Sequence, residues 1–392
     1  MEFRTDRSTF AETVAWAARV LPTRSPVPVL GGLLLAAEGG TLRISGLDYE
    51  ASACIEVPVD TVRPGKVLVM GRRLLDICRV LPEGPVECAV EASRFTVTGA
   101  GTSFGLSVLP LDDYPALPAL PELRGSVDTA AFAAAVAHVA VAAGRDDALP
   151  VLTGIRLSLD GGTMTLAATD RYRFAVRALA WDPESEDVSA DVVVPARRLT
   201  EIARSLSRTG TVRVALGEGS IGFENTGPQK TPGARRTAGA QGPPGTPGTR
   251  TTVRLLEGRL PRHDKLFTMD SPAVAVTDRA PLLEAVRRVA VVAEGVSPVR
   301  LDFSPDAVHL HAGYEDDVAS QRLPAVLAGT GGIAVAFNPA YLTDALSALD
   351  SDCVRFDLLG PGQRALLTGL SAPDADPDPA HRHLLMSLKP LM

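Results

Sequence analysis

Cysteine is scarce in this sequence: the 392 residues contain four cysteines, and no two of them have a CxxC spacing. This argues against a structural zinc site and against a secreted fold held by disulfides, and it suits buried thiols in a reducing cytosol. No run of about 18 apolar residues occurs, so no transmembrane helix is expected. The opening MEFRTDRSTF also lacks the basic start and apolar stretch of a signal peptide. The sequence therefore predicts a cytoplasmic protein without a membrane partner.

Catalytic patterns are missing as well. No GxSxG elbow occurs, so the Ser, His and Asp residues form no recognisable triad. His309 with His311 and His381 with His383 form two HxH pairs, but no third metal ligand accompanies either pair. We interpret these histidines as residues of the surface or of a pocket rim. The sequence predicts a protein that is not an enzyme and that holds no metal or cofactor.

The composition that remains is typical of a globular chain. Hydrophobic residues make up 45% of the sequence and charged residues 22%, which is enough for a sizeable core. At 392 residues the chain is too long for one ordinary domain, and its length indicates two or three. The formal net charge of −7 argues against nucleic-acid binding by the whole surface, but it leaves room for a local basic face.

The chain repeats itself three times. Helix-period segments begin at Asp6, Asp128 and Asp278, and each is followed by strand-like runs. PVLGGLLL matches PVLTGIRL in register, and EGGTLRISGLD matches DGGTMTLAATD. Each repeat also has a second half, in which a strand leads into a helix: VLVMGRRLLDICRVLP, VVVPARRLTEIARSLS and IAVAFNPAYLTDALSALD. The sequence therefore predicts six similar half-units.

These patterns predict an α+β fold of three repeated domains, each with two helices packed on antiparallel sheets. The expected boundaries give domains at 1–123, 124–267 and 268–392. Residues 226–250 contain no aromatic residue and no aliphatic residue larger than Ala. Such a Gly/Pro-rich insertion cannot pack a core, so we expect a disordered loop inside the second domain.

Arginines recur on equivalent helices. Arg72 and Arg79 are seven residues apart and share one helical face, which Arg73 borders. Arg197 and Arg204 form a comparable stripe in the second repeat. One interpretation is a basic surface for a polyanion, and the other is an ordinary solvated helix face. The third repeat leaves the pattern incomplete, because PAYLTDALSALD contains no basic residue.

Together these segments resemble the beta sliding clamp of bacterial DNA polymerase III, over nearly the whole chain. The resemblance rests on the threefold repeat and on PVLGGLLL, ISGLDYE, LPLDDYPALP, GRDDALPVLTGIR, LAATDRYRFAVR, FNPAYLTDAL and HLLM. It implies that each chain forms half of a ring, closed by a head-to-tail homodimer with helices lining the hole. Such a ring encircles double-stranded DNA and tethers the polymerase without reading sequence. It also implies that Arg24 contacts DNA, and we add Arg72, Arg73, Arg79, Arg197 and Arg204 from the stripes.

The resemblance further implies an apolar pocket that receives short motifs from the polymerase III alpha subunit, the clamp loader and other clamp-binding proteins. Such a pocket binds a peptide through apolar anchors flanked by polar groups. The matching positions are Leu152, Thr169, Arg171, Tyr172, Arg173, Phe174, Pro261, Lys265, Leu266, Leu384 and Met386.

The end of the chain departs from the family pattern. His383 replaces a Tyr, Ser387 replaces a Pro and Lys389 replaces an Arg, and three further residues follow as Pro-Leu-Met. We expect these changes to alter the pocket rim. Two alternatives therefore stay open beside the replicative clamp. One is a specialised second clamp, for example one tolerant of pocket-binding inhibitors, and the other is a protein-interaction scaffold with weak DNA loading.

Overall fold

The computed structural model describes residues 1–22, 27–206, 209–225, 248–261, 264–293, 297–314 and 316–389. The chain divides into two compact units. Unit 1 consists of Met1–Ala130, Asp182–Ser185 and Arg204–Leu255, and unit 2 of Ala131–Trp181, Glu186–Ala203 and Leu256–Met392. Within the described ranges, no helix is both long enough and apolar enough to cross a membrane.

Each α-helix in the described residues follows a strand closely, as the repeats predict. The helices are α1 (Arg7–Ala17), α2 (Gly71–Val80), α3 (Thr129–Ala140), α4 (Ala196–Ser205), α5 (Arg279–Val289) and α6 (Pro339–Ala348). The strands before them are β1 (Glu2–Asp6), β6 (Gly65–Met70), β10 (Leu123–Asp128), β15 (Ser189–Pro195), β19 (Ala273–Asp278) and β24 (Ile333–Phe337). Asp6 ends β1, and its Oδ1 accepts a hydrogen bond from the Ser8 N–H at 2.8 Å, which caps α1. The equivalent Asp278 stands at the N-cap of α5 but makes no side-chain cap hydrogen bond there.

Unit 1 contains two antiparallel sheets. Its further strands are β2 (Gly32–Glu38), β3 (Thr41–Leu47), β4 (Ala51–Pro58), β5 (Asp60–Arg63), β7 (Pro85–Glu91), β8 (Arg94–Gly99), β9 (Thr102–Ser107), β14 (Asp182–Pro183), β16 (Thr211–Gly217), β17 (Ser220–Asn225) and β18 (Gly248–Arg254). The strand orders are β5-β1-β7-β8-β9 and β14-β10-β16-β17-β18-β4-β3-β2-β6. The β4–β18 pair joins the first repeat to the second.

Unit 2 also contains two antiparallel sheets. Its further strands are β11 (Gly154–Asp160), β12 (Thr163–Thr169), β13 (Arg173–Ala180), β20 (Val299–Ser304), β21 (Ala307–Tyr314), β22 (Asp317–Pro324), β23 (Val326–Ala328), β25 (Cys353–Leu358), β26 (Arg364–Leu370) and β27 (His381–Met386). The strand orders are β15-β11-β12-β13-β27-β26-β25-β19-β23 and β22-β21-β20-β24. The β13–β27 pair joins the second repeat to the third.

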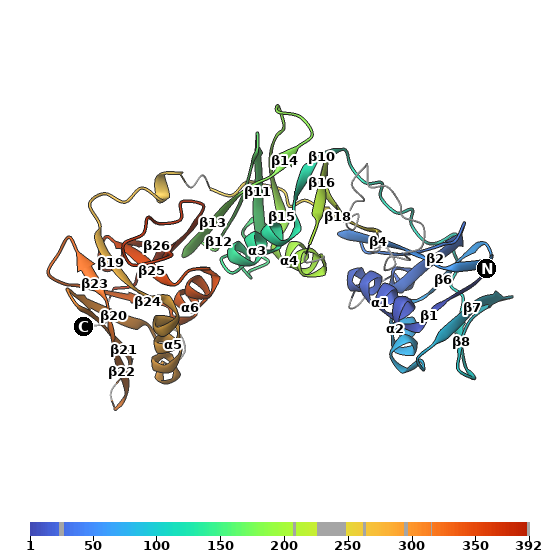
Figure 1. Cartoon of the computed structure of the whole chain (residues 1–392), viewed down its shortest axis with the longest axis horizontal. Helices are drawn as coiled ribbons and strands as arrows, with labels where there is room; N and C mark the ends of the chain where they lie inside the picture. The colour runs from blue at the N-terminus through green and yellow to red at the C-terminus, as the bar shows by residue number, and fades with distance from the viewer. Residues whose placement is uncertain are drawn as a thin grey trace, which may run out of the picture. The chain divides into compact units, whose positions relative to one another are not determined.

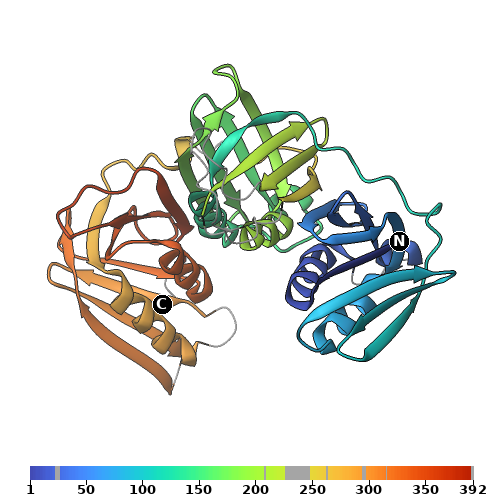
Figure 2. The same ribbon diagram turned by 45° about the vertical axis from the view of Figure 1, so that its right-hand side comes forward.

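The helices cover the sheets in pairs, with α1 beside α2 and α5 beside α6 (Figures 1 and 2). In α2 the spacing of four residues places Leu74 and Cys78 on one buried face, so the arginines of this helix remain exposed. Leu74 and Cys78 enter a core cluster that also contains Phe10 and Val14 of α1. The sequence prediction of an α+β fold with helices on antiparallel sheets is therefore confirmed.

One backbone hydrogen bond recurs in all three repeats. The N–H groups of Leu109, Leu256 and Leu388 donate to the carbonyl groups of Leu68, Val193 and Ala336, at 2.8, 2.8 and 2.7 Å. Each acceptor lies in the strand that leads into the second helix of its repeat. The apolar segment HLLMSLK at the end of the sequence is therefore anchored by the same backbone hydrogen bond as the segments that follow β9 and β18.

The predicted insertion requires a correction at its end. Residues 226–247 lie outside the described residues, but 248–250 form the start of β18, where Thr249 pairs with Asn225 and with Ile55. The β-branched threonines of GTRTTV suit a strand between two neighbours. The domain boundaries near 123 and 268 stay a prediction.

Candidate functional site

A tight turn between β12 and β13 organises the most distinctive site. Asp170 Oδ1 accepts hydrogen bonds from the N–H groups of Tyr172 and Arg173, at 3.0 and 3.1 Å. Thr169 Oγ1 donates to the Arg173 carbonyl at 2.7 Å and accepts from the Arg171 N–H at 3.2 Å. Such side-chain acceptors replace the missing ladder bonds of a turn. The turn leaves Tyr172 56% exposed and Arg171 at a φ of 82°.

Arg173 connects this turn to α6. Its guanidinium donates to Asp170 Oδ2 at 2.9 Å and to Asp344 Oδ2 at 2.7 Å, and it lies 4.2 Å from the ring centre of Tyr341. The side chain is only 7% exposed, so the buried positive charge needs these carboxylate partners to offset its loss of hydration. Burial, followed by the charge of Asp170, raises the pKa of Tyr341. The turn and α6 therefore form one rigid wall.

A cleft of about 570 Å³ opens against this wall. It is lined by the turn, by α6 and by the segment that follows α3. The structure brings four predicted residues together here: Leu152, Arg171, Tyr172 and Arg173. Arg173 is buried, Leu152 is half-buried, and Arg171 and Tyr172 are exposed. An open apolar surface with hydrogen-bonding groups at its edge suits a short peptide.

Sequence reasoning missed the other lining residues of this cleft, among them Arg145, Tyr341 and Asp344. Tyr341 and Asp344 lie in FNPAYLTDAL, a motif already noted in the sequence, but nothing local places α6 beside a turn 171 residues away. Arg145 lies in GRDDALP, just before the predicted Leu152.

Other predicted residues form a neighbouring apolar cluster instead of lining the cleft. Phe174 faces Leu384 across the β13–β27 pair, and its ring meets that of Phe267 edge-on at 5.8 Å. Leu266 packs against the same cluster. Because alternate residues of a strand face opposite sides, Phe174 and Arg173 serve different surfaces. Met386 links the two, since its N–H donates to the Tyr172 carbonyl at 2.8 Å and its side chain is 36% exposed.

Three predicted pocket residues have other positions. Thr169 is 5% exposed and holds the turn from inside. Lys265 is exposed, and its carbonyl accepts from the Arg364 guanidinium at 3.2 Å. Pro261 is exposed and belongs to neither the cleft nor the cluster.

The prediction that His381 and His383 lie at a surface or rim is wrong. They are 3% and 2% exposed, their Nε2 atoms are 3.0 Å apart, and the ring of His138 stacks on His381 at 4.5 Å. Burial lowers the pKa of His381 to about 2 and that of His383 to about 3. In the described part of the chain, no group of three or more His, Cys, Asp or Glu side chains could hold a metal ion. His309 and His311 are exposed, as predicted.

The rim position predicted for Ser387 also needs correction. Ser387 is 4% exposed, and its hydroxyl proton has two carbonyl acceptors within reach, those of Gly360 and Gln363 at 3.0 and 2.7 Å. The hydroxyl also accepts from the Gln363 N–H at 3.1 Å. A serine can bury itself here because the neighbouring loop satisfies its hydrogen bonds. Lys389 is exposed, and Pro390–Met392 lie outside the described residues.

The arginines of α2 all reach solvent but differ in their partners. Arg72 donates to the Pro22 carbonyl at 3.2 Å, and Arg79 pairs with Asp76 at 3.0 Å. Within the described ranges, the Arg73 side chain makes no hydrogen bond or ion pair. Arg73 is therefore the arginine of α2 best able to pair with an external anion.

The arginines of α4 show the same contrast. Arg197 is 84% exposed at its side chain but pairs with Glu201 at 3.1 Å. Arg204 is exposed, and its side chain has no partner among the described residues. Arg24, which the resemblance placed at DNA, lies outside the described residues.

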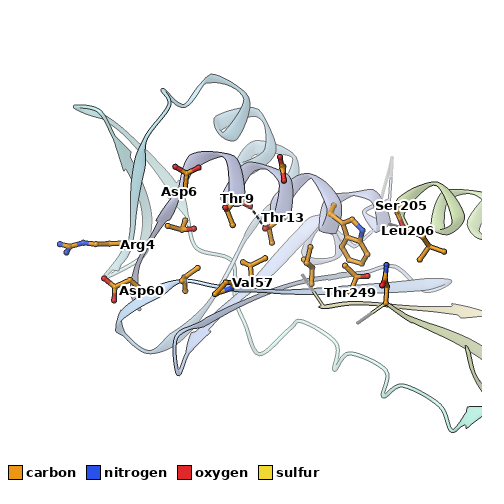
Figure 3. Close-up of a pocket in the computed structure, with 16 residues that line it drawn as sticks. Arg4, Asp6, Thr9, Thr13, Val57, Asp60, Ser205, Leu206 and Thr249 are labelled. Atoms are coloured by element: carbon orange, nitrogen blue, oxygen red, sulfur yellow. Dashed lines mark hydrogen bonds between the residues drawn. The ribbon is translucent and has the colours of Figure 1, made fainter. Parts of the chain in front are cut away.

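A larger cavity of about 780 Å³ lies in unit 1, and the sequence did not predict it. Figure 3 shows Thr9 and Thr13 of α1, Val57 of β4 and Thr249 of β18 among its lining residues, with Leu206 just beyond α4. None of the predicted site residues lines this cavity. Its lining includes both Asn225 and Thr249, between which residues 226–247 run outside the described structure.

Comparison with known proteins accounts for the three repeats. Profiles of the DNA polymerase III beta subunit match in three parts: the N-terminal domain at residues 1–118, the central domain at 126–231 and the C-terminal domain at 264–381. The beta sliding clamp of Streptomyces coelicolor is 46% identical over 395 residues, covering 99% of each chain.

Two further proteins are similar over their full lengths. The beta sliding clamp homolog GriR of Streptomyces muensis is 42% identical over 391 residues, again 99% of each chain. The crystal structure of a Pseudomonas aeruginosa sliding clamp bound to griselimycin shares 26% identity and a TM-score of 0.87, with 100% of both chains covered.

Proposed function

Because this chain belongs to the DNA polymerase III beta subunit family, we propose that it encircles duplex DNA as a ring-shaped homodimer and tethers DNA polymerase to its template. Members of this family are replication processivity factors, and the chain is not an enzyme. The observation that carries the proposal is the threefold repeat, because all three domains match in order. Since its proposed partner is DNA, we place the protein in the cytoplasm.

The exposed arginines support sequence-independent DNA contact. Arg73 and Arg204 have no side-chain partner in the described structure, so their charges are free to neutralise phosphates. Phosphate contacts attract DNA without reading bases, which suits a protein that slides. Arg72, Arg79 and Arg197 add charge at the same helices, and their ion pairs and hydrogen bonds must open before they reach DNA.

Two open sheet edges support a head-to-tail homodimer. β9 ends one sheet of unit 1 and β22 ends one sheet of unit 2. Phe104 and Leu106 are half-buried on β9, while Val318 on β22 is 67% exposed. An unpaired edge with apolar side chains is a template for pairing with another chain. Because the edges differ, two copies can close a ring through two such contacts.

The cleft supports binding of short motifs from the polymerase III alpha subunit, the clamp loader and other clamp-binding proteins. Tyr172 offers an exposed aromatic face, and Leu152 offers an apolar anchor site next to it. Binding in such a cleft leaves the rest of the ring free to move along DNA. One clamp can therefore serve several partners in turn.

Charge reversal tests the DNA interface. Arg73→Glu with Arg204→Glu should reduce loading onto circular DNA by about tenfold and flatten its salt dependence, because two phosphate contacts are lost. Arg63→Glu, on the edge strand β5, is the control: it breaks an exposed ion pair with Glu2 and should load normally. Normal loading and processivity by the double variant would show that these helices do not face DNA.

Light scattering at micromolar concentration tests the dimer, and a monomer mass would exclude the closed ring.

A specialised second clamp is the alternative, and one observation favours it. The Ser387 hydroxyl is hydrogen-bonded to the loop of Gly360 and Gln363 just after β27, where family members typically carry Pro, and β27 also supplies Met386 beside the cleft. Titration of a labelled clamp-binding peptide from the replicative polymerase separates the two functions. Ordinary affinity supports a housekeeping clamp, and weak affinity supports a specialised one. A scaffold that loads poorly would bind the peptide but fail on circular DNA.

A further inference from the structure

The cavity of unit 1 opens at the joint between the first and second repeats. Thr249 of β18 and His381 of β27 occupy equivalent positions in the two joints, as the pairing of β18 with β4 and of β27 with β13 shows. Trp16 of α1 and His138 of α3 are also equivalent, since each lies at the same interval after the aspartate that precedes its helix. In the second joint the rings of His138 and His381 stack at 4.5 Å. The first joint has Thr249 in place of a ring, and there the cavity of about 780 Å³ is found.

A helix and a strand of unit 1 form the walls of this cavity. Thr9, Thr13 and Trp16 are spaced by four and three residues, so they lie on one face of α1. Ile55 and Val57 are alternate residues of β4, so they share one face of the sheet. Figure 3 shows Thr9 and Thr13 on the side of α1 that faces Val57. The volume and the apolar walls suit a small organic molecule.

Trp16 contributes an unused hydrogen-bond donor to this lining. The Nε1 atom of its indole is buried, and it has no acceptor among the described residues. The hydroxyl of Thr13 is directed elsewhere, since it donates to the Thr9 carbonyl at 2.6 Å. A buried indole N–H group usually has an acceptor. An acceptor atom on a ligand would supply the missing partner.

The charged residues of the lining leave two carboxylates available. Glu12 and Asp60 are exposed, and within the described residues neither side chain makes an ion pair or a hydrogen bond. The other two charged groups are engaged. Arg4 pairs with Glu87 at 2.9 Å, and Asp6 caps α1. The charge available to a ligand at this cavity is therefore negative.

We propose that the cavity binds an organic cation that carries an apolar body and a hydrogen-bond acceptor. The apolar body lies between α1 and β4, the acceptor takes the Trp16 N–H, and the cationic group is attracted to the carboxylates of Glu12 and Asp60. A cation close to the indole also gains from the negative face of the ring. This site goes beyond the proposed clamp function, because it uses none of the residues proposed to contact DNA or partner peptides.

The test uses the full-length protein and two fluorescent probes. Dansylcadaverine has a naphthalene ring, a sulfonyl acceptor and a primary ammonium group, and N-pentyl dansylamide has the same body without the charge. Dansyl emission increases in apolar surroundings, so titration gives both affinities. Dansylcadaverine should bind about fivefold more tightly than the neutral probe, the upper range for an exposed ion pair. This preference should disappear at about 1 M NaCl, where charges are screened within a few ångströms.

Carboxylate variants test the charge preference. Glu12→Gln combined with Asp60→Asn should make the two probes bind equally, because both unpaired carboxylates are removed. Glu38→Gln is the matched control, since Glu38 is an exposed carboxylate of the same unit that does not line the cavity. It should leave the preference unchanged.

Variants of the walls locate the probes. Thr249→His gives the first joint the residue found in the second and should weaken both probes by about tenfold or more, because a filled site resists added volume. Thr249→Val keeps the size of the side chain and is its control, with both affinities expected to stay the same. Trp16→Phe keeps an aromatic ring without the N–H and should weaken both probes by about threefold.

Each outcome supports or overturns the site without bearing on DNA loading or peptide binding. Equal binding of the two probes by the natural protein overturns it, as does failure of both probes to bind. Affinities that Thr249→His leaves unchanged would show that the probes bind elsewhere, and this also overturns it. A cation preference that the double carboxylate variant loses and Glu38→Gln retains, together with weaker binding by Thr249→His, establishes the site.

Discussion

The turn between β3 and β4 and the turn between β12 and β13 have the same backbone frame and different surroundings. In the first, Asp48 Oδ1 accepts from the N–H groups of Glu50 and Ala51 at 2.9 and 2.7 Å, as Asp170 does in the second. The Glu50 carbonyl accepts from the N–H of Arg254 in β18 at 2.8 Å, the equivalent of the bond between Tyr172 and Met386.

The surroundings of the two turns explain how the second turn opens a cleft. In the first repeat Leu30 is 1% exposed and packs with Tyr114, which lies in the segment after β9. In the second repeat Leu152 lines open space. Where the first turn carries the small Ala51, the second carries Arg173 with its two carboxylate partners. The proposed binding site thus differs from the turn of the first repeat in the residues that cover it and in one buried charge.

The largest expected effect comes from removing that charge. Arg173→Ala gives the second turn the residue of the first and leaves Asp170 and Asp344 buried or half-buried without their cation. Breaking such a pair should lower the free energy of unfolding by about 4 kcal/mol and abolish peptide binding. Urea denaturation and anisotropy measure the two effects. Arg177→Ala, on the same strand, removes a more exposed pair and should cost about 1 kcal/mol; an equal loss there would contradict the special role of Arg173.

The reciprocal change opens the first repeat. Tyr114→Ala removes the cover over Leu30 and leaves a cavity, which should lower the free energy of unfolding of unit 1 by about 3 kcal/mol. Peptide affinity at the second turn should stay the same. Tyr114→Phe keeps the ring and is the control, with an expected change within about 1 kcal/mol. Weaker peptide binding by Tyr114→Ala would show that the two turns are coupled.

The joints between repeats should respond differently to acid. His381 and His383 lie in the β13–β27 joint, whereas neither β4 nor β18 contains a histidine. Their folded pKa values, about 2 and about 3, lie below the ordinary value of 6.5. As the pH falls, these histidines are therefore protonated in the unfolded chain before they are protonated in the folded protein. Stability from these neutral histidines is complete above about pH 6.5 and falls as the pH drops toward the folded values.

We expect unit 2 to lose about 2 kcal/mol between pH 6.5 and pH 5.5, and unit 1 to lose less. Trp16 lies in unit 1 and Trp181 in unit 2, so single-tryptophan variants can report each unit by fluorescence during urea titration. His381→Gln with His383→Gln should reduce the acid sensitivity of unit 2. Equal acid sensitivity of both units would contradict the assignment.

The smallest expected effect concerns Ser387. The N–H groups of Val108, Leu255 and Ser387 make equivalent backbone hydrogen bonds in the three repeats, at 3.0, 2.9 and 2.9 Å. Only the third position carries a hydroxyl. Ser387→Val leaves the Gln363 N–H without the hydroxyl acceptor and should cost about 1 kcal/mol. Peptide affinity should remain unchanged because Ser387 does not line the cleft; a changed affinity would favour the specialised clamp.

The local elements could be predicted because motifs mark them. PVLGG and PVLTG precede equivalent strands, and Asp6 both ends a strand and caps a helix. The contacts that complete the site could not be predicted in this way. Arg173 meets Asp344 from 171 residues away, and His138 of α3 stacks on His381 of β27. No local periodicity encodes such encounters. The resemblance named residues of both the cleft and the apolar cluster, but it did not divide them between the two.

The hydrogen bond shared by Leu109, Leu256 and Leu388 has a mechanical consequence. Each leucine fastens the segment after it to the strand that leads into the second helix of its repeat. Tension applied to such a segment is therefore borne by that strand before it can reach the turn. A load pulling on the chain beyond Leu388 therefore acts first on β24, the strand that leads into α6 at the cleft.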